Sequence, residues 1–190
     1  MTPREAQNIV KKIKRSKFKC ILPEEALVAL KTIYESKKIR EFLSESNNIE
    51  NVWDEESLRD ALKAWKYLNK CKTFTIDNIL KAHGIMSRRA THIQNDQKGK
   101  FRKVAIWIGE REGKPWYALP VLMTQWVEKA STSKTIEEFW QDHISFEHIH
   151  PFVDFNGRMG RLIFLWQCIK NNVPIKVIYE KDKWEYYQMF

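Results

Sequence analysis

The residues best suited to chemistry stand within twelve consecutive positions, 150–161, which read HPFVDFNGRMGR and are called the signature segment below. The segment combines an imidazole, a carboxylate, an amide and two guanidinium groups. A neutral imidazole can take a proton from a hydroxyl near pH 7, a carboxylate is a hard ligand for Mg²⁺, and guanidinium groups bind phosphate oxygens. The apolar run 162–166 that follows indicates a buried helix. Because a helix N-terminus attracts anions, the segment predicts a site for a nucleotide polyphosphate and a metal.

The signature segment resembles the Fic family pattern H-P-F-x-(D/E)-G-N-G-R-x-x-R, and eight of its nine fixed positions are filled. Residues 99–102 (GKFR) also resemble the G-x-(F/Y)-R segment of that family. The resemblance covers roughly residues 75–190. It implies an enzyme that transfers AMP from ATP, its substrate, to a hydroxyl side chain of a target protein, with Mg²⁺ as cofactor.

The resemblance also implies a role for each matching position. His150 is expected to be the catalytic base, and Asp154 is expected to be the metal ligand. Of the two arginines, the first would contact the α- and β-phosphates and the second the γ-phosphate. The positions expected to bind the nucleotide are Asn156, Gly157, Arg158 and Arg161.

Phe155 is the departure from the family pattern, which has its first glycine there. Glycine is required only where φ is positive or where a ligand approaches the backbone too closely. If either condition holds, Phe155 would weaken ATP binding or alter the pose of ATP, and we expect activity to survive. Among the other histidines, we expect His148 to be structural and His143 to be exposed, and we assign no role to His83 or His92.

Residues 46–51 (SNNIEN) match a second Fic pattern, (S/T)-x-x-x-E-(G/N). This pattern implies a short inhibitory helix, as in the subgroup that carries such a helix N-terminal to the catalytic motif. Glu50 would pair with Arg161 and keep it from the γ-phosphate, while Ser46 lies on the same helix face at i, i+4. A desolvated carboxylate–guanidinium pair can compete with phosphate. Whether Glu50 also helps to remove AMP from targets stays open.

The elements that must position these residues are mainly helical, because apolar residues recur at helical spacing through most of the chain. We expect a single, mostly α domain with one β-hairpin, in which residues 104–108 pair with 116–118 across a turn at 109–114. Residues 1–70 would form an N-terminal helical region with the inhibitory helix at about 46–51. Residues 71–190 would form the Fic catalytic core with a flap hairpin at about 103–119. The expected helices span 3–16, 23–34, 46–50, 55–68, 76–86, 136–148, 158–171 and 181–190.

The flap is the expected contact for the target protein. An exposed hairpin edge can bind an extended peptide through main-chain hydrogen bonds, and the flap of Fic proteins lines up the target segment. Trp184, Tyr186 and Tyr187 lie where Fic proteins often place a helix near adenine, so one of them could stack on the base or belong to the core.

Composition limits the classes of protein. With 190 residues and 43% hydrophobic content, the chain can form one globular domain. No apolar run approaches the ~18 residues that span a bilayer, so we expect no membrane partner. Cys20, Cys71 and Cys168 are odd in number and far apart, which fits reduced thiols in a cytoplasmic protein.

The net charge of +9 is concentrated near the N-terminus, where residues 1–40 hold 11 Lys or Arg against 4 Asp or Glu. This basic arm could bind nucleic acid or another anionic partner. A solvated helix surface is favoured, since no nucleic-acid-binding motif accompanies the charge. Two alternatives to adenylylation remain: a related transferase with another phosphate donor, and a non-catalytic module that senses nucleotide. Assembly into a homo-oligomer is also left open.

Overall fold

The computed structural model describes residues 24–190. The predicted basic arm, the helix at 3–16, the helix start at Pro23 and the thiol of Cys20 lie outside the described residues. The chain divides into two compact units between Glu41 and Phe42. In the first unit, the N-terminal part of helix α2 (Glu24–Ile49) carries a surface ion pair between Lys31 and Glu35. The domain boundary expected near residue 70 stays a prediction.

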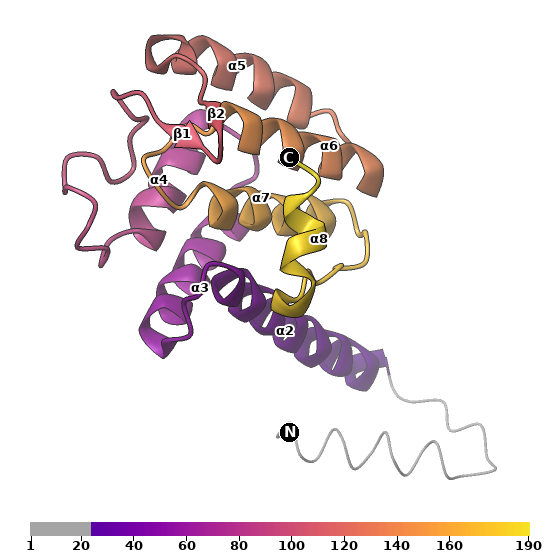
Figure 1. Cartoon of the computed structure of the whole chain (residues 1–190). Helices are drawn as coiled ribbons and strands as arrows, with labels where there is room; N and C mark the ends of the chain where they lie inside the picture. Colours follow the sequence, from indigo (N-terminus) through magenta and orange to yellow (C-terminus); the bar gives the residue numbers. More distant parts are fainter. Residues whose placement is uncertain (1–23) are drawn as a thin grey trace. The chain divides into compact units, whose positions relative to one another are not determined.

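The second unit is mostly helical with one small hairpin, as the sequence predicted (Figure 1). None of the helices that the structure describes is long and apolar enough to cross a membrane. After the end of α2, its helices are α3 (Glu55–Lys70), α4 (Ile76–Met86), α5 (Leu119–Ala130), α6 (Ile136–Ile149), α7 (Asn156–Lys170) and α8 (Lys183–Tyr187), with 3-10 turns at Trp116–Ala118 and Glu180–Asp182.

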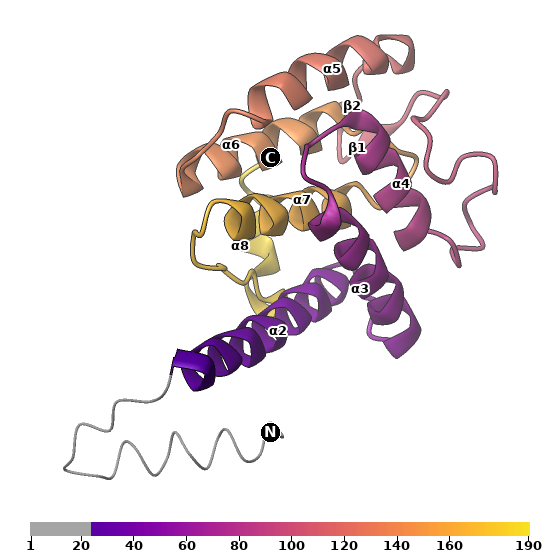
Figure 2. The same cartoon turned by 180° about the vertical axis from the view of Figure 1, so that it is seen from behind.

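Helix α7 is the centre of this unit, and both views show other helices around it (Figures 1 and 2). Every side chain from Arg158 to Cys168 is buried. A helix that is apolar on all sides must be surrounded by other elements. Helix α6 packs against α7 and α5, and α3 packs against α4 and α7. The signature segment therefore leads directly into the core.

The starts of three helices follow from capping residues. Asp54 caps α3 by accepting the Ser57 N–H at 2.7 Å, and Thr75 caps α4, as one of the two predicted candidates. Helix α6 begins with a capping box between Thr135 and Glu138. Because α6 is fixed at its start, its last turn places the beginning of the signature segment at a defined position.

Some predicted elements were wrong. The separate helix at 46–50 does not exist, because residues 24–49 contain no proline or glycine and form one continuous helix, α2. Its last turn carries Ser46, and Glu50 follows it directly. The last helix is shorter than predicted, and α5 was not identified from the sequence, although Pro120 marks its first turn.

The hairpin is smaller than predicted. Strands β1 (Trp107–Ile108) and β2 (Arg111–Glu112) are antiparallel, with Trp107 opposite Glu112. Gly109 has a positive φ of 60° and lets the chain reverse earlier than expected. The predicted second strand at 116–118 is wrong, since these residues form a 3-10 helix after Pro115.

Candidate active site

The first half of the signature segment, residues 150–155, forms a loop between α6 and α7, and its second half forms the first turns of α7. Helix α6 ends at His150, whose left-handed φ of 51° turns the chain away from the helix axis. The buried amide of Asn156 then donates to the Phe152 carbonyl and accepts the Phe152 N–H, both at 2.9 Å. The ring of Phe152 is fully buried. The loop is thus held by its own side chains before any ligand binds.

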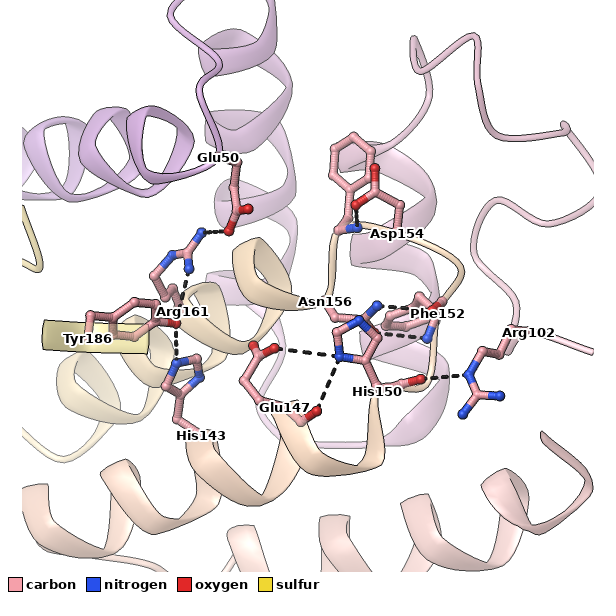
Figure 3. A network of polar contacts seen from close by, with 11 residues as sticks. Glu50, Arg102, His143, Glu147, His150, Phe152, Asp154, Asn156, Arg161 and Tyr186 are labelled. Atoms are coloured by element: carbon pink, nitrogen blue, oxygen red, sulfur yellow. Dashed lines mark hydrogen bonds and ion pairs between the residues drawn. The ribbon is translucent and has the colours of Figure 1, made fainter. Parts of the chain in front are cut away.

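Arg102 ties this loop to the flap (Figure 3). Its buried guanidinium donates from Nε to the His150 carbonyl at 2.9 Å. The two other nitrogens donate to the carbonyls of Val104 and Lys114, at 2.8 and 2.5 Å, on either side of the flap base. The GKFR segment signalled this residue, and the structure shows what it contacts.

One cavity of about 540 Å³ collects the predicted site residues. It is bordered by the flap residues Ile108, Gly109 and Arg111 on one side. Tyr187 and Phe190, from the end of the chain, border another part. The predicted residues that line it are Glu50, His150, Asp154, Asn156, Gly157, Arg158 and Arg161. Ser46 does not line the cavity but contacts one of these arginines.

The ring of His150 is held in an orientation suited to a base (Figure 3). Its Nδ1 lies 3.2 Å from the Glu147 carbonyl oxygen, which can only accept a hydrogen bond. Nδ1 therefore carries the proton, and Nε2 keeps a free lone pair. Burial lowers the pKa of His150 below its usual 6.5, so the ring is neutral near pH 7.

Arg161 is engaged on all sides of its guanidinium and only 1% exposed. Its Nε donates to the Ser46 hydroxyl at 2.9 Å, and its Nη2 donates to the Ser46 carbonyl and to Glu50 Oε1, at 2.9 and 2.5 Å. Its Nη1 donates to the Tyr186 hydroxyl at 3.0 Å. Burial alone would lower the pKa of Arg161, but Tyr186 and Glu50 outweigh burial and raise it.

Gly157 allows the Arg161–Glu50 pair to lie across the first turn of α7. A Cβ atom at this position would come within 2.6 Å of Glu50 Oε1 and 3.0 Å of Arg161 Nη1. Gly157 therefore lets the side chains of Glu50 and Arg161 approach the backbone closely, in addition to its predicted place in the nucleotide site.

Asp154 is the carboxylate available for a metal. Its side chain is 42% exposed, and it lines the cavity. No group of three or more His, Cys, Asp or Glu side chains within residues 24–190 could hold a metal ion. A single carboxylate facing an open cavity fits Mg²⁺ that arrives with phosphates and waters as its other ligands. Asp154 does not cap α7, since its Oδ1 accepts the N–H of Phe155 at 2.5 Å.

The two histidines to which no role was assigned both contact Asp154. His83 accepts the Gly99 N–H at Nδ1 (2.9 Å), so its Nε2–H donates to the Asp154 carbonyl at 3.2 Å. Burial lowers the pKa of His83 to about 4, which keeps this arrangement neutral. His92 Nε2 lies 2.7 Å from Asp154 Oδ2. Only the fold brings them together, and no sequence motif marks either one.

The expectation that His143 is exposed was wrong. The ring is buried, and its Nε2 lies 2.7 Å from the Tyr186 hydroxyl (Figure 3). Burial, together with the charge of Arg161, lowers the pKa of His143 to about 3. Burial raises the pKa of nearby Glu147 to about 8, so this carboxyl is mainly protonated at pH 7. The buried network therefore carries its positive charge on Arg161.

Phe155 meets the first of the two conditions under which glycine is required, because its φ is 67°. Its ring is nonetheless buried, with the guanidinium carbon of Arg158 only 3.4 Å from the ring centroid. Arg158 also faces Asp154, with 3.6 Å between Nη2 and Oδ2. The non-family residue is thus in direct contact with a predicted phosphate-binding arginine.

Solved structures share this fold. A Fic family protein from Desulfovibrio desulfuricans superposes with a TM-score of 0.68 at 22% identity, covering 99% of this chain and 66% of the other. A Fic domain containing signaling protein from Bacteroides thetaiotaomicron gives 0.71 at 16% identity, covering 97% and 78%. Fic-1 from C. elegans gives 0.69 at 19% identity, covering 97% and 62%.

Curated relatives match part of the chain. Proteins named protein adenylyltransferase Fic from Drosophila sechellia and Drosophila melanogaster are 29% identical to it over 130 residues, 65% of this chain. The chain spans only 26% of the length of these relatives. The family model described as Fic/DOC family matches residues 73–168, just over half of the chain, including the whole signature segment. By this match and its fold, the chain belongs to the Fic/DOC family.

Proposed function

We propose that the chain is a protein adenylyltransferase that moves AMP from ATP to a hydroxyl side chain of a target protein and is held inactive by Glu50. The observation that carries the proposal is the ion pair between Glu50 and Arg161, which lies in the same cavity as His150. The names of the Drosophila relatives support the same reaction.

The chemistry follows from the free lone pair of His150 Nε2. The target hydroxyl attacks the α-phosphorus of ATP and passes its proton to Nε2, and the bond from the α-phosphorus to the bridging oxygen breaks, releasing pyrophosphate. Asp154 would hold Mg²⁺, which neutralises phosphate charge when bound. Arg158, Asn156 and the amides at Gly157 would bind the phosphate oxygens.

Inhibition follows from the contacts of Arg161. Its three nitrogens already donate to Ser46, Glu50 and Tyr186, so a γ-phosphate must displace the carboxylate to reach it. Ser46 and Glu50 fit the pattern of the subgroup with an N-terminal inhibitory helix, and the last turn of α2 would take the place of that helix here. Removing the Glu50 carboxylate would therefore release Arg161 for the nucleotide.

The exposed aromatic residues of the flap support its proposed contact with the target protein. Trp107 and Tyr117 are 71% and 72% exposed, and Trp116 packs edge-on against Tyr117. Large exposed aromatic side chains that lie close together are typical of interaction sites. When other proteins are added to the assay below and their masses are also read, Trp107→Ala should reduce transfer to them more than it reduces self-modification. The free thiols of Cys71 and Cys168 fit the cytoplasmic location that we propose.

The test compares wild type, Glu50→Gln and Glu50→Gln/His150→Ala, each incubated with Mg²⁺ and ATP, by intact mass. An adduct with the mass of one AMP should increase in the single variant and disappear in the double variant. Glu128→Gln, which removes an exposed carboxylate on α5, is the matched control and should behave as wild type.

The second candidate is a related transferase with another phosphate donor, and the left-handed position of Phe155 is the observation that favours it. The same mass measurement distinguishes the two, since UMP, phosphocholine and phosphate adducts differ in mass from AMP. A chain that binds nucleotide but forms no adduct with any donor, even as Glu50→Gln, would instead be a nucleotide-sensing module.

A further inference from the structure

Phe155 occupies a backbone conformation that a bulky residue rarely adopts. At a φ of 67° its Cβ is crowded by the backbone, and only glycine is free of this cost. A bulky residue persists there only when its surroundings hold it. The contacts of Phe155 therefore indicate what the side chain does.

The backbone of Phe155 is held from both sides. Its N–H donates to Asp154 Oδ1, and its carbonyl accepts the Met159 N–H at 2.9 Å, the first hydrogen bond of α7. The preceding carbonyl, of Asp154, accepts from His83. His83 also lies edge-on to the Phe155 ring, at 6.1 Å and 86°. The ring thus has little freedom to leave its position.

The Phe155 ring lies beside two flat groups. It contacts the Arg158 guanidinium, whose carbon is 3.4 Å from the ring centroid. The His92 ring lies parallel to the Phe155 ring within 7°, with centroids 6.4 Å apart. Stacking covers one face of the guanidinium without using any of its N–H donors, which all lie in the guanidinium plane.

Arg158 differs from Arg161 in how it is held. Arg161 is fixed by hydrogen bonds from all three nitrogens, whereas the buried Nε of Arg158 has no hydrogen-bond partner in the described part of the chain. The nearest acid, Asp154, lies 3.6 Å from Nη2. The ring of Phe155 therefore contacts the guanidinium more closely than Asp154 does, while Arg158 also lines the cavity.

We propose that Phe155 is a positioning residue, which holds the Arg158 guanidinium flat so that its edge can bind two oxygens of a diphosphate group. This inference rests on the proposed function, because it assigns Arg158 to the phosphates of the donor. The family glycine has no side chain that could supply such a contact. Phe155 thus lacks the backbone freedom of the family glycine, but its ring fixes the orientation of the Arg158 guanidinium.

The test is a double-mutant cycle on ligand binding, with Glu50→Gln/His150→Ala as the parent to release Arg161 and to prevent turnover. The dissociation constant of Mg²⁺·ATP is measured by calorimetry for the parent, Phe155→Leu, Arg158→Lys and the combined variant. Phe155→Leu keeps an apolar side chain but removes the aromatic face. It should weaken binding about tenfold in the parent and less than about twofold beside Arg158→Lys. Phe155→Tyr keeps the ring and should bind as the parent does.

Two results would overturn the proposal. Equal loss of affinity in both arginine backgrounds, with a lowered melting temperature, would mean that Phe155 only supports the loop. Unchanged affinity in Phe155→Leu would mean that the ring does not orient Arg158. If Mg²⁺·ATP fails to bind the parent, the proposed donor is wrong, and the cycle is repeated with Mg²⁺ and pyrophosphate. Pyrophosphate offers the same oxygens without a base, and its failure to bind would overturn the inference as well.

Discussion

The protonation state of His150 follows from two features of its ring. The Glu147 carbonyl fixes the proton on Nδ1, and burial disfavours the charged imidazolium. A neutral ring with a free Nε2 can accept a proton, whereas the protonated ring cannot. The same burial acts on His83 and His143, but His83 is bonded through both ring nitrogens, His143 is bonded through Nε2 to Tyr186, and neither lines the cavity. His150 lines the cavity and is therefore the histidine suited to act as base.

This assignment predicts the acid limb of the pH–rate profile. Since burial lowers the pKa of His150 from 6.5, the midpoint of the acid limb for transfer by Glu50→Gln should lie below pH 6.5. The measurement is the initial rate of AMP incorporation at saturating Mg²⁺·ATP from pH 5 to 8. A midpoint above 6.5 would contradict a buried His150 as the base.

At the scale of elements, the end of α2, the first turns of α7 and helix α8 meet at one buried network. Tyr186 of α8 accepts from Arg161 of α7 and lies beside His143 of α6. Tyr187, the next residue, donates to the Ile49 carbonyl at the end of α2, at 3.2 Å. The short helix α8 is therefore docked by hydroxyl groups as well as by aromatic packing.

Tyr186→Phe should lower the free energy of unfolding by about 1–3 kcal/mol, because it leaves buried groups on Arg161 and His143 without a partner. Tyr187→Phe is the matched control. It should cost at most about 1 kcal/mol, because its single hydrogen bond is longer and half-buried. Urea unfolding of both variants measures the difference. Equal losses would indicate that the Tyr186 hydroxyl adds nothing beyond ordinary packing.

At the scale of the whole molecule, the ion pair between Glu50 and Arg161 should affect both the stability of the fold and the proposed activity. The carboxylate of Glu50 pairs with the buried guanidinium of Arg161. The other described hydrogen-bond partners of Arg161, Ser46 and Tyr186, are neutral. Removing the acid leaves a buried charge less well compensated. The inhibited state would then also be the more stable state of the ligand-free protein.

Glu50→Gln should therefore unfold more easily than wild type, by about 1–3 kcal/mol, while its transfer rate rises. Saturating Mg²⁺·ATP should return part of the lost stability, since a ligand that binds only the folded state stabilises it. Thermal melting with and without nucleotide measures both effects, with Glu128→Gln as control. A Glu50→Gln variant as stable as wild type would argue that the Glu50–Arg161 ion pair does not stabilise the folded protein.

Several features of the site could be predicted because they are local. The spacing within the signature segment places Asp154, Arg158 and Arg161 around the start of a helix, whatever surrounds it. The exposure of His143 was misjudged although a signal existed. Phe139, His143 and Phe146 recur at helical spacing, and this face of α6 is buried. The hairpin was displaced because β-branched and aromatic residues suggested a longer strand than the turn at Gly109 allows.

The sequence by itself determined the family, the helical fold class and the residues of the signature segment, since these depend on residue type and short-range spacing. The tertiary structure alone decided which distant groups meet them. Tyr186 of α8 reaches Arg161, and His83 of α4 reaches the Asp154 carbonyl. The pairing of Glu50 with Arg161 was expected from the family resemblance and not from the spacing of the residues. The left-handed backbone at Phe155 likewise depends on that packing. Contacts between distant elements depend on how whole helices pack, and one sequence does not reveal this.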